Sequence, residues 1–143
     1  MILDTNVLLA ATDEGRAEHG EALAMLDHWP GEGATLYASG QILREYLAVA
    51  TRPADHNGLG LSRSDAVTNV RAIRERTRLL AENAKVSDRL LELVKETACG
   101  GKQIHDANVV ATMLVHGVDA IVTMNVDDFA RFDQHVTVIN LSS

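Results

Sequence analysis

Cysteine and aromatic residues are scarce in this 143-residue chain, which has one cysteine, Cys99, and an aromatic content of 3%. A single cysteine excludes an internal disulfide and suits a reducing compartment. With so few aromatic rings, the hydrophobic core has to be built from Leu, Val, Ile and Ala. The same scarcity argues against platforms for stacking nucleobases.

Long hydrophobic runs are also missing. No apolar run approaches the ~20 residues that a membrane-spanning helix needs. No basic region precedes the short apolar stretch at the N-terminus, so a secretory signal is not predicted. We therefore expect a cytoplasmic protein without a membrane segment.

Basic residues are fewer than acidic ones, 13 against 20, which gives a formal net charge of −7. This balance argues against indiscriminate binding to nucleic acid. It does not exclude an enzyme that acts on nucleic acid, because acidic residues that collect a metal ion would themselves add negative charge.

Short apolar segments alternate with amphipathic ones along the chain. The pattern predicts strands at residues 1–3, 34–39, 119–124 and 136–141, an ambiguous strand at 77–81, and helices at 5–12, 16–29, 40–51, 62–76, 86–98 and within 101–117. Thr5 or Asn6 is expected to cap the first helix, and Ser39 the third. Such alternation predicts an α/β fold, with one domain over residues 1–141, a central and mostly parallel β-sheet, helices on both faces, and a two-residue tail at 142–143.

Asp106 stands in the apolar stripe of the helix within residues 101–117. At about 100° per residue, Met113 falls about 20° to one side of it and Val110 about 40° to the other. A carboxylate buried without partners costs several kcal/mol. The position therefore predicts either a functional acid or a buried salt bridge to an arginine.

Other acids fall where ligands bind in open parallel sheets, beyond the carboxyl ends of the strands. Asp4 ends the first predicted strand, the segment 123–128 follows a later one, and Glu45 lies at the margin of its helix's apolar arc. Three or four converging carboxylates repel one another, and a hard divalent cation such as Mg²⁺ or Mn²⁺ relieves that repulsion. Zinc is not predicted, because the histidines form no close pair on a helix face and there is no cysteine pair.

Each acid also has a simpler interpretation. Asp4 could only cap the first helix, and Glu45 could be a solvated helix residue. Asp127 and Asp128 could form a turn with two solvated charges.

Four segments in this order resemble the PIN domain, and most closely the VapC toxins of bacterial type II toxin–antitoxin pairs. They are "ILDTNVLL" at residues 2–9, Glu45 in the helix after the second strand, "HDANVVATMLVHG" at 105–117 and "VTMNVDDF" at 122–129. The resemblance extends from Met1 to about Leu141. It implies a PIN-like nuclease domain over that range.

The resemblance implies metal ligands at Asp4 and Asp106, with Glu45 as a third acid. Many PIN domains have an aspartate where this chain has Asn125, which is therefore expected to orient water or substrate, with Asp128 supplying charge and possible contact with the metal. Residues supporting the ligands are expected at Thr5, Asn6 and Thr123.

The implied activity is that of a Mg²⁺-dependent endoribonuclease, with Mn²⁺ as an alternative ion. A metal-activated water would hydrolyse RNA phosphodiesters and leave 5′-phosphate and 3′-hydroxyl ends. The implied partners are an RNA substrate, a cognate VapB-like antitoxin and a second copy of the chain in a homodimer. Antitoxin contacts are expected along the helices at 39–51 and 62–76, including Ile42, Leu43, Tyr46 and Leu47, unless these side chains belong to the core.

A local excess of basic residues could hold the RNA. Residues 63–89 contain seven of them and only four acidic residues, the basic ones being Arg63, Arg71, Arg74, Arg76, Arg78, Lys85 and Arg89. The excess could contact phosphates, or it could be a solvated helix face with scattered ion pairs.

Two other functions are compatible with parts of the pattern. A phosphatase with an aspartate nucleophile usually has a second aspartate where this chain has Asn6. A catalytically degenerate PIN fold could serve only as a binding module, although such a module has no need to keep Asp4, Glu45 and Asp106 together.

Overall fold

The computed structural model describes residues 1–142, so Ser143 of the predicted tail lies outside the described residues. Its centre is a five-stranded sheet in the order β3-β2-β1-β4-β5, and all neighbouring strands are parallel. The strands are β1 (Ile2–Leu3), β2 (Tyr37–Ser39), β3 (Arg78–Leu80), β4 (Ala120–Thr123) and β5 (Thr137–Asn140). The predicted α/β class and parallel sheet are confirmed, and the ambiguous segment 77–81 contains a strand.

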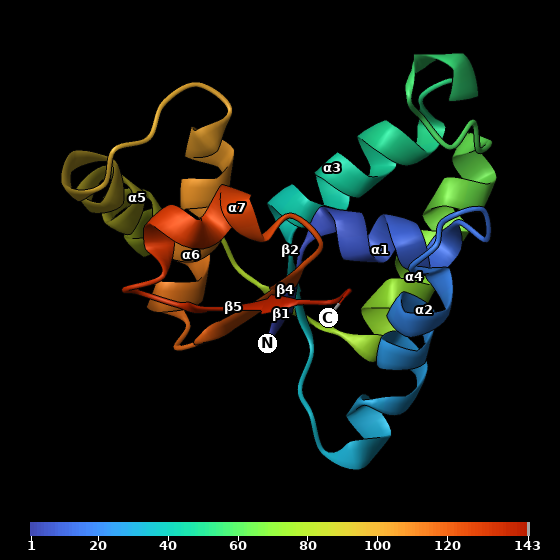
Figure 1. Cartoon of the computed structure of the whole chain (residues 1–143), viewed down its shortest axis with the longest axis horizontal. Helices are drawn as coiled ribbons and strands as arrows, with labels where there is room; N and C mark the ends of the chain where they lie inside the picture. The colour runs from blue at the N-terminus through green and yellow to red at the C-terminus, as the bar shows by residue number, and fades with distance from the viewer. Residues whose placement is uncertain (143) are drawn as a thin grey trace.

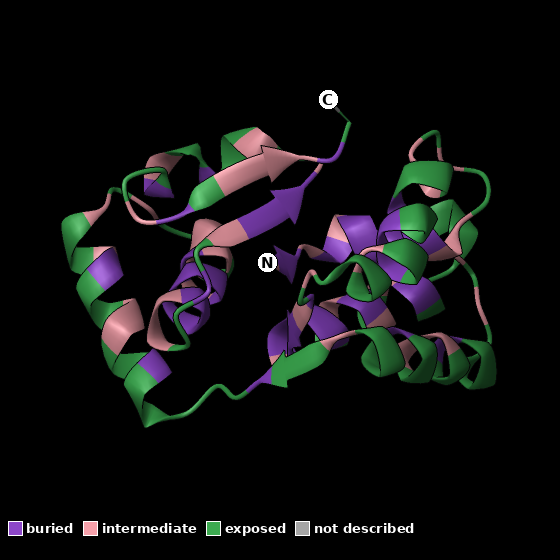
Figure 2. Cartoon of the chain, turned by 90° about the horizontal axis from the view of Figure 1, so that it is seen from below, coloured by how far each residue is buried: buried purple, intermediate pink, exposed green. Residues whose placement is uncertain are grey.

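Two groups of helices flank the sheet, as Figures 1 and 2 show. One group contains α1 (Thr5–Thr12), α2 (His19–His28), α3 (Gly40–Thr51) and α4 (Arg63–Arg76). The other contains α5 (Ala84–Glu96) and α6 (Gln103–Val115), while the single-turn helix α7 (Val126–Phe129) follows β4. No helix in the described part of the chain is long and apolar enough to cross a membrane.

Helix starts follow from local hydrogen bonds. The side chain of Asp4 accepts from the Thr5 amide, so Asp4 is the N-cap of α1, and the prediction of Thr5 or Asn6 as the cap was wrong. Ser39 caps α3 as predicted, by accepting from the Ile42 amide. Helix α2 begins later than predicted, since both the carbonyl and the carboxylate of Asp13 bind Arg16 and hold that segment in a turn.

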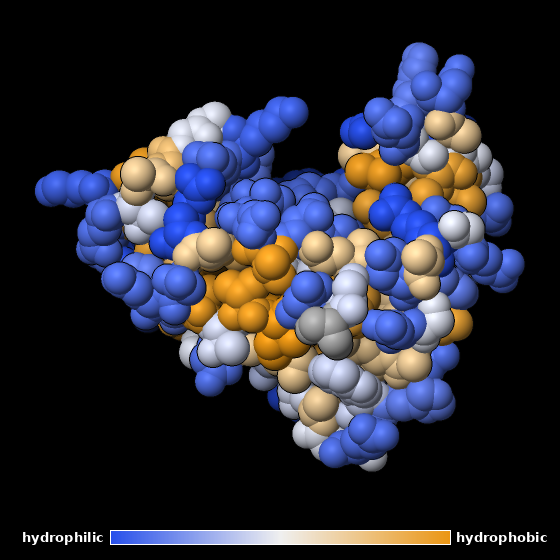
Figure 3. All heavy atoms as spheres, in the orientation of Figure 1, coloured by the Kyte–Doolittle hydropathy of each residue, from blue (hydrophilic) through white to orange (hydrophobic). Residues whose placement is uncertain are grey.

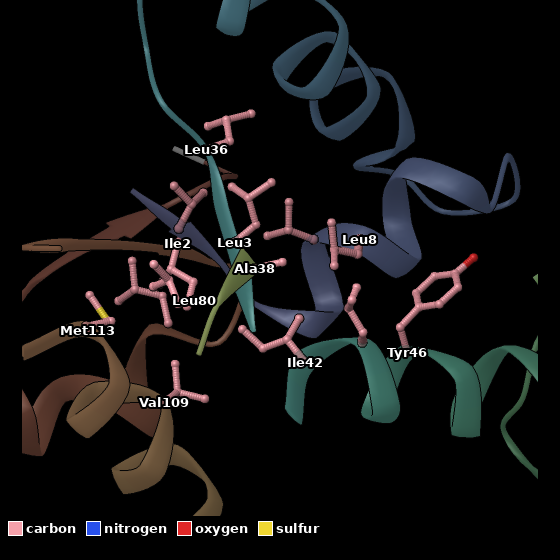
Figure 4. Packing of buried hydrophobic residues seen from close by; sticks show 14 of the residues in the cluster. Ile2, Leu3, Leu8, Leu36, Ala38, Ile42, Tyr46, Leu80, Val109 and Met113 are labelled. Carbon is pink, nitrogen blue, oxygen red and sulfur yellow. The ribbon is translucent and has the colours of Figure 1, made fainter. Parts of the chain in front are cut away.

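Aliphatic side chains fill the space between the sheet and both helix groups. Figure 4 shows Val109 and Met113 of α6 on one side of the strands and Leu8 and Ile42 on the other. Each buried aliphatic side chain of this size contributes roughly 1.5–3 kcal/mol relative to its exposed state. The core is therefore built without a large aromatic content, as the composition predicts.

Helix α3 is covered by α1 and α4, which decides between the core and the antitoxin surface as the place of its apolar side chains. Ile42 and Tyr46 are 0% exposed and Leu43 is 9% exposed. Leu47 is half-buried. The buried Tyr46 hydroxyl lies 2.8 Å from the Thr12 hydroxyl and accepts from Asn69, which anchors it within the core. Ile42, Leu43 and Tyr46 are core residues and are not available to a partner.

The strand order determines where the chain can hold a ligand. Strands β2 and β3 are added on one side of β1, and the chain then crosses to place β4 and β5 on the other side. The carboxyl ends of β1 and β4 therefore flank a reversal in strand order, where open parallel sheets bind ligands. Asp4 and Thr123 stand at these two ends.

Candidate active site

Asp4 is held by hydrogen bonds to both carboxylate oxygens. Its Oδ1 accepts from the Thr5 amide at 2.8 Å, and its Oδ2 accepts from the Thr123 hydroxyl at 2.8 Å. The Thr123 Oγ1 in turn accepts from the Asn6 side chain at 3.3 Å and from the Asn125 amide at 3.0 Å. The two bonds that the Thr123 hydroxyl accepts fix its orientation, so that its single proton points to Asp4.

Asn6 joins the same two strand ends. Its Oδ1 accepts from the Met124 amide at 3.2 Å while its Nδ2 donates to Thr123. The predicted supporting residues, Thr5, Asn6 and Thr123, therefore all lie around Asp4. Asn125 is exposed at the start of α7, where its side chain makes no capping hydrogen bond.

Glu45 is half-buried and has a partner for each carboxylate oxygen. Its Oε2 accepts from the Thr5 hydroxyl at 3.1 Å, and its Oε1 accepts from the Gln41 side chain at 2.6 Å. The interpretation of Glu45 as a solvated helix residue does not hold. Thr5 links the two acids directly, because its amide binds Asp4 and its hydroxyl binds Glu45.

Glu45, Asp106 and Asp128 all face one open cleft of ≈ 660 Å³. Figure 3 shows a hollow along the upper edge of the molecule, with hydrophilic residues along its floor and left side, between the part of the chain with α5 and the part with α3 and α4. The residues that line the cleft are Gln41, Arg44, Glu45, Lys102, Gln103, His105, Asp106 and Asp128. Asp127 and Asp128 are both exposed, but only Asp128 lines the cleft.

The acids repel one another across this site. Burial raises the pKa of Asp4, and the charges of Glu45 and Asp128 raise it further, while its hydrogen bonds from Thr123 and Thr5 act in the opposite direction. Burial, followed by the charges of Asp128, Asp4 and Glu45, raises the pKa of Asp106 to about 6. Glu45 and Asp128 are therefore close enough to Asp4 and Asp106 to penalise the ionisation of those two aspartates.

Asp106 forms no salt bridge within the described residues, so the alternative of a buried ion pair is not realised. The charge of Arg131 lowers the pKa of Asp106 only as the smallest of the effects on it. The guanidinium donates instead to the Ala98 carbonyl at 2.9 Å. Asp106 is half-buried in the first turn of α6 and opens onto the cleft, which explains an acid in the apolar stripe.

A family model for the PIN domain matches residues 1–134 of this chain. The chain belongs to the PIN domain family. It is also 30% identical over 135 residues to "Ribonuclease VapC24" of Mycobacterium tuberculosis, which covers 91% of this chain and 89% of that protein. The predicted resemblance to VapC-type PIN domains is therefore confirmed.

Solved structures of VapC-type proteins share the fold of this PIN domain. A DNA-bound VapBC from Salmonella typhimurium matches with a TM-score of 0.69 and 15% identity, over 98% of this chain and 96% of that one. VapC20 of Mycobacterium tuberculosis, described as a sarcin–ricin loop cleaving toxin, matches with a TM-score of 0.62 and 20% identity, over 84% and 85% of the two chains. At these identities the likeness establishes the fold alone.

The donor set of this PIN domain fits a hard divalent cation. The converging side chains offer oxygen ligands, which Mg²⁺ and Mn²⁺ prefer. Within residues 1–142, no three His, Cys, Asp or Glu side chains approach closely enough to hold an ion by themselves. Mg²⁺ usually takes one or two protein carboxylates and completes its shell with water and substrate phosphate, so it does not require such a group of three.

The predicted basic stretch at residues 63–89 does not border the cleft of the PIN domain. None of its seven basic residues is among those that line it. Arg76 pairs with Asp27 and Arg89 with Glu92, while α4 and α5 lie on opposite sides of the sheet in Figure 1. The stretch is therefore divided between separate surfaces.

Sequence reasoning missed several residues of the cleft. Arg44 on α3, with Lys102 and His105 at the start of α6, brings cationic or titratable side chains to its walls. Gln41 lines it as well and contacts Glu45. The available signal was helical spacing, since Gln41 precedes Glu45 by four residues and such pairs share a helix face.

Proposed function

We propose that this PIN domain protein is a divalent-metal-dependent endoribonuclease and the toxin of a type II toxin–antitoxin pair. It hydrolyses RNA phosphodiesters and leaves 5′-phosphate and 3′-hydroxyl ends. The observation that carries this proposal is the convergence of Asp4, Glu45, Asp106 and Asp128 beside one open cleft. A VapC relative named as a ribonuclease supports the enzyme class.

Asp4 and Asp106 are the proposed protein ligands of Mg²⁺, with Mn²⁺ as a substitute. Such an ion would supply positive charge for the phosphodiester oxygens and would make a neighbouring water more acidic. Glu45, held by Thr5 and Gln41, orients the attacking water, and Asp128 adds charge at the cleft wall. Asn125, exposed beside the same strand end, orients water or substrate.

Incubation of the purified chain with a panel of tRNA and mRNA tests the proposal. We expect cleavage with Mg²⁺ or Mn²⁺, no cleavage with EDTA, and recovery when excess Mg²⁺ is added back. The new 5′ ends are expected to accept a ligase-joined adaptor without prior phosphorylation, because they carry a phosphate. A chain that binds neither ion and cuts no RNA would support the degenerate binding module instead.

The cleft walls predict how an acidic protein holds RNA. Arg44 and Lys102 reach the cleft from different helices, so both can contact phosphates beside the acids. Replacing both by alanine is expected to weaken RNA binding and to reduce the slope of log affinity against log salt by about 1 for each lost phosphate contact. Fluorescence anisotropy in metal-free buffer, where RNA stays intact, measures this slope.

The matched control replaces Arg71 and Arg74 of α4, which do not line the cleft, by alanine. This pair removes the same charge and is expected to change the salt slope less. A larger change in the salt slope from the α4 pair than from Arg44 and Lys102 would place the RNA contact on α4, and the proposed contact at the cleft would then be wrong.

Solved relatives support an antitoxin as the partner, since they include a toxin–antitoxin complex from Klebsiella pneumoniae and a VapBC2 complex from Rickettsia felis bound to promoter DNA. We expect a VapB-like antitoxin to cover the cleft and a second copy of the chain to form a homodimer. We expect the protein to bind both partners and the RNA substrate in the cytoplasm. Size-exclusion chromatography with light scattering tests the dimer.

A further inference from the structure

Gln41 is a buried amide that joins the two halves of the cleft. It is 6% exposed and lies at the start of α3. Its Nε2 donates to Glu45 Oε1 at 2.6 Å and to the His105 carbonyl at 2.9 Å. Its Oε1 accepts from Asn108 Nδ2 at 2.6 Å, and its backbone amide donates to Glu82 at 2.7 Å.

These contacts allow only one orientation of the Gln41 side chain. Its two N–H groups face two acceptors, the Glu45 carboxylate and the His105 carbonyl, while its oxygen faces the Asn108 donor. Turning the amide over would set oxygen against oxygen at Glu45 and nitrogen against nitrogen at Asn108. A buried amide with both donors satisfied is costly to disturb, because each lost partner leaves a desolvated polar group.

The partners of Gln41 come from helices on opposite sides of the sheet. Glu45 belongs to α3, while His105 and Asn108 belong to α6. Asp106 follows directly after the carbonyl that Gln41 binds. The Gln41 side chain therefore contacts Glu45 directly and the backbone next to Asp106. These contacts fix the separation between α3 and α6, the helices that carry the two acids.

We propose that Gln41 is a positioning residue that holds Glu45 and Asp106 at the separation required for binding the divalent ion. This role rests on the proposed function, because it concerns the same acids. Thr5 holds the other oxygen of Glu45, so loss of Gln41 leaves that carboxylate attached on one side only. Partners of this kind typically change metal affinity by 10- to 100-fold when removed.

The variant Gln41→Met tests this role, because methionine has a similar length and lacks every hydrogen bond of the amide. Isothermal titration calorimetry with Mn²⁺ alone, on the full chain well below its unfolding temperature, is expected to give an affinity about tenfold lower than wild type. The control is Gln103→Met, since Gln103 also lines the cleft, but within residues 1–142 its side chain binds the Gly100 amide alone. It is expected to bind Mn²⁺ as wild type does.

A double-mutant cycle separates positioning from a general structural role. If Gln41 acts through Glu45, Gln41→Met is expected to lower the Mn²⁺ affinity much less in a Glu45→Gln background than in wild type, because the partner is already altered. An equal loss in both backgrounds would overturn the positioning of Glu45 by Gln41. If Gln41→Met does not fold, Asn108→Ala removes the donor to Gln41 and is expected to weaken Mn²⁺ binding by a smaller factor.

The two proposals fail in different ways. A wild-type chain that binds no Mn²⁺ overturns the proposed function and this role with it. A wild-type chain that binds Mn²⁺, together with a folded Gln41→Met variant of unchanged affinity, overturns the positioning role alone.

Discussion

Asp4→Asn is expected to lower the rate of RNA cleavage by about 10³-fold or more, since the ion is proposed to contribute several kcal/mol to the reaction. Asparagine has nearly the same shape and keeps an oxygen for the Thr5 amide, so the N-cap of α1 survives. It removes the charge that would hold the ion. Single-turnover cleavage at saturating RNA, measured over a range of Mg²⁺ concentrations, checks the loss.

Asp127→Asn is the matched control for this prediction. Asp127 is an acid in the short helix after β4, but it is exposed and does not line the cleft. The same change of one charge is therefore expected to leave cleavage near the wild-type rate. Equal activities for the Asp4 and Asp127 variants, with both folded by circular dichroism, would remove Asp4 from the proposed reaction.

The fold and the acids were predictable because each leaves a local signal. The short apolar segments around Ile2 and Ile121 predict buried parallel strands, and the order of the elements then predicts which strand ends meet. Asp106 interrupts an apolar stripe, and Asp4 ends a buried strand. Each of these residues departs from its surroundings, and a departure can be seen within about ten residues of sequence.

Gln41, Arg44 and Lys102 do not depart from their sequence surroundings in this way. Gln41 lies in an ordinary helical position, and its contact with the His105 carbonyl joins residues 64 positions apart in the chain. A contact of that kind depends on how α3 and α6 pack, which helical spacing does not specify. The position of Lys102 beside the cleft also depends on how α3 and α6 pack. Local charge counts favoured residues 63–89 instead.

The apolar face of α3 could not be assigned from the sequence for a related reason. The spacing of Ile42 and Tyr46 predicts an apolar helix face, and the sequence alone allowed that face to belong to the core or to a partner site. Two helices, α1 and α4, cover it in the folded chain. Whether an apolar face is covered is decided by elements remote in sequence.

Asp106→Asn is expected to stabilise the metal-free protein at neutral pH, although it removes a proposed metal ligand. The pKa of Asp106 is raised from its ordinary value of 3.8 to about 6 in the folded chain. Between these two values the folded state retains a proton that the unfolded chain has released. Stability from this group therefore falls as pH rises from about 4 to about 6, and the full penalty persists above that range.

The size of this effect is limited by solvent. Raising the pKa of a fully buried carboxyl from 3.8 to about 6 corresponds to roughly 3 kcal/mol. Asp106 is only half-buried, so about 1 kcal/mol is a better expectation after screening by water. Urea unfolding in EDTA is expected to show Asp106→Asn more stable than wild type by this amount at pH 7.5, with the difference disappearing near pH 4.

Adding Mn²⁺ is expected to reverse the order of stability at pH 7.5. An ion that binds only the folded state stabilises it by mass action, by about 2.7 kcal/mol at 100 times its dissociation constant. Wild type gains that stabilisation because the ion compensates the repulsion between its acids. Asp106→Asn lacks one proposed ligand and therefore gains less. Asp127→Asn is expected to follow wild type under both conditions. Equal stabilisation of wild type and Asp106→Asn by Mn²⁺ would mean that the ion binds elsewhere and that Asp106 is not one of its ligands.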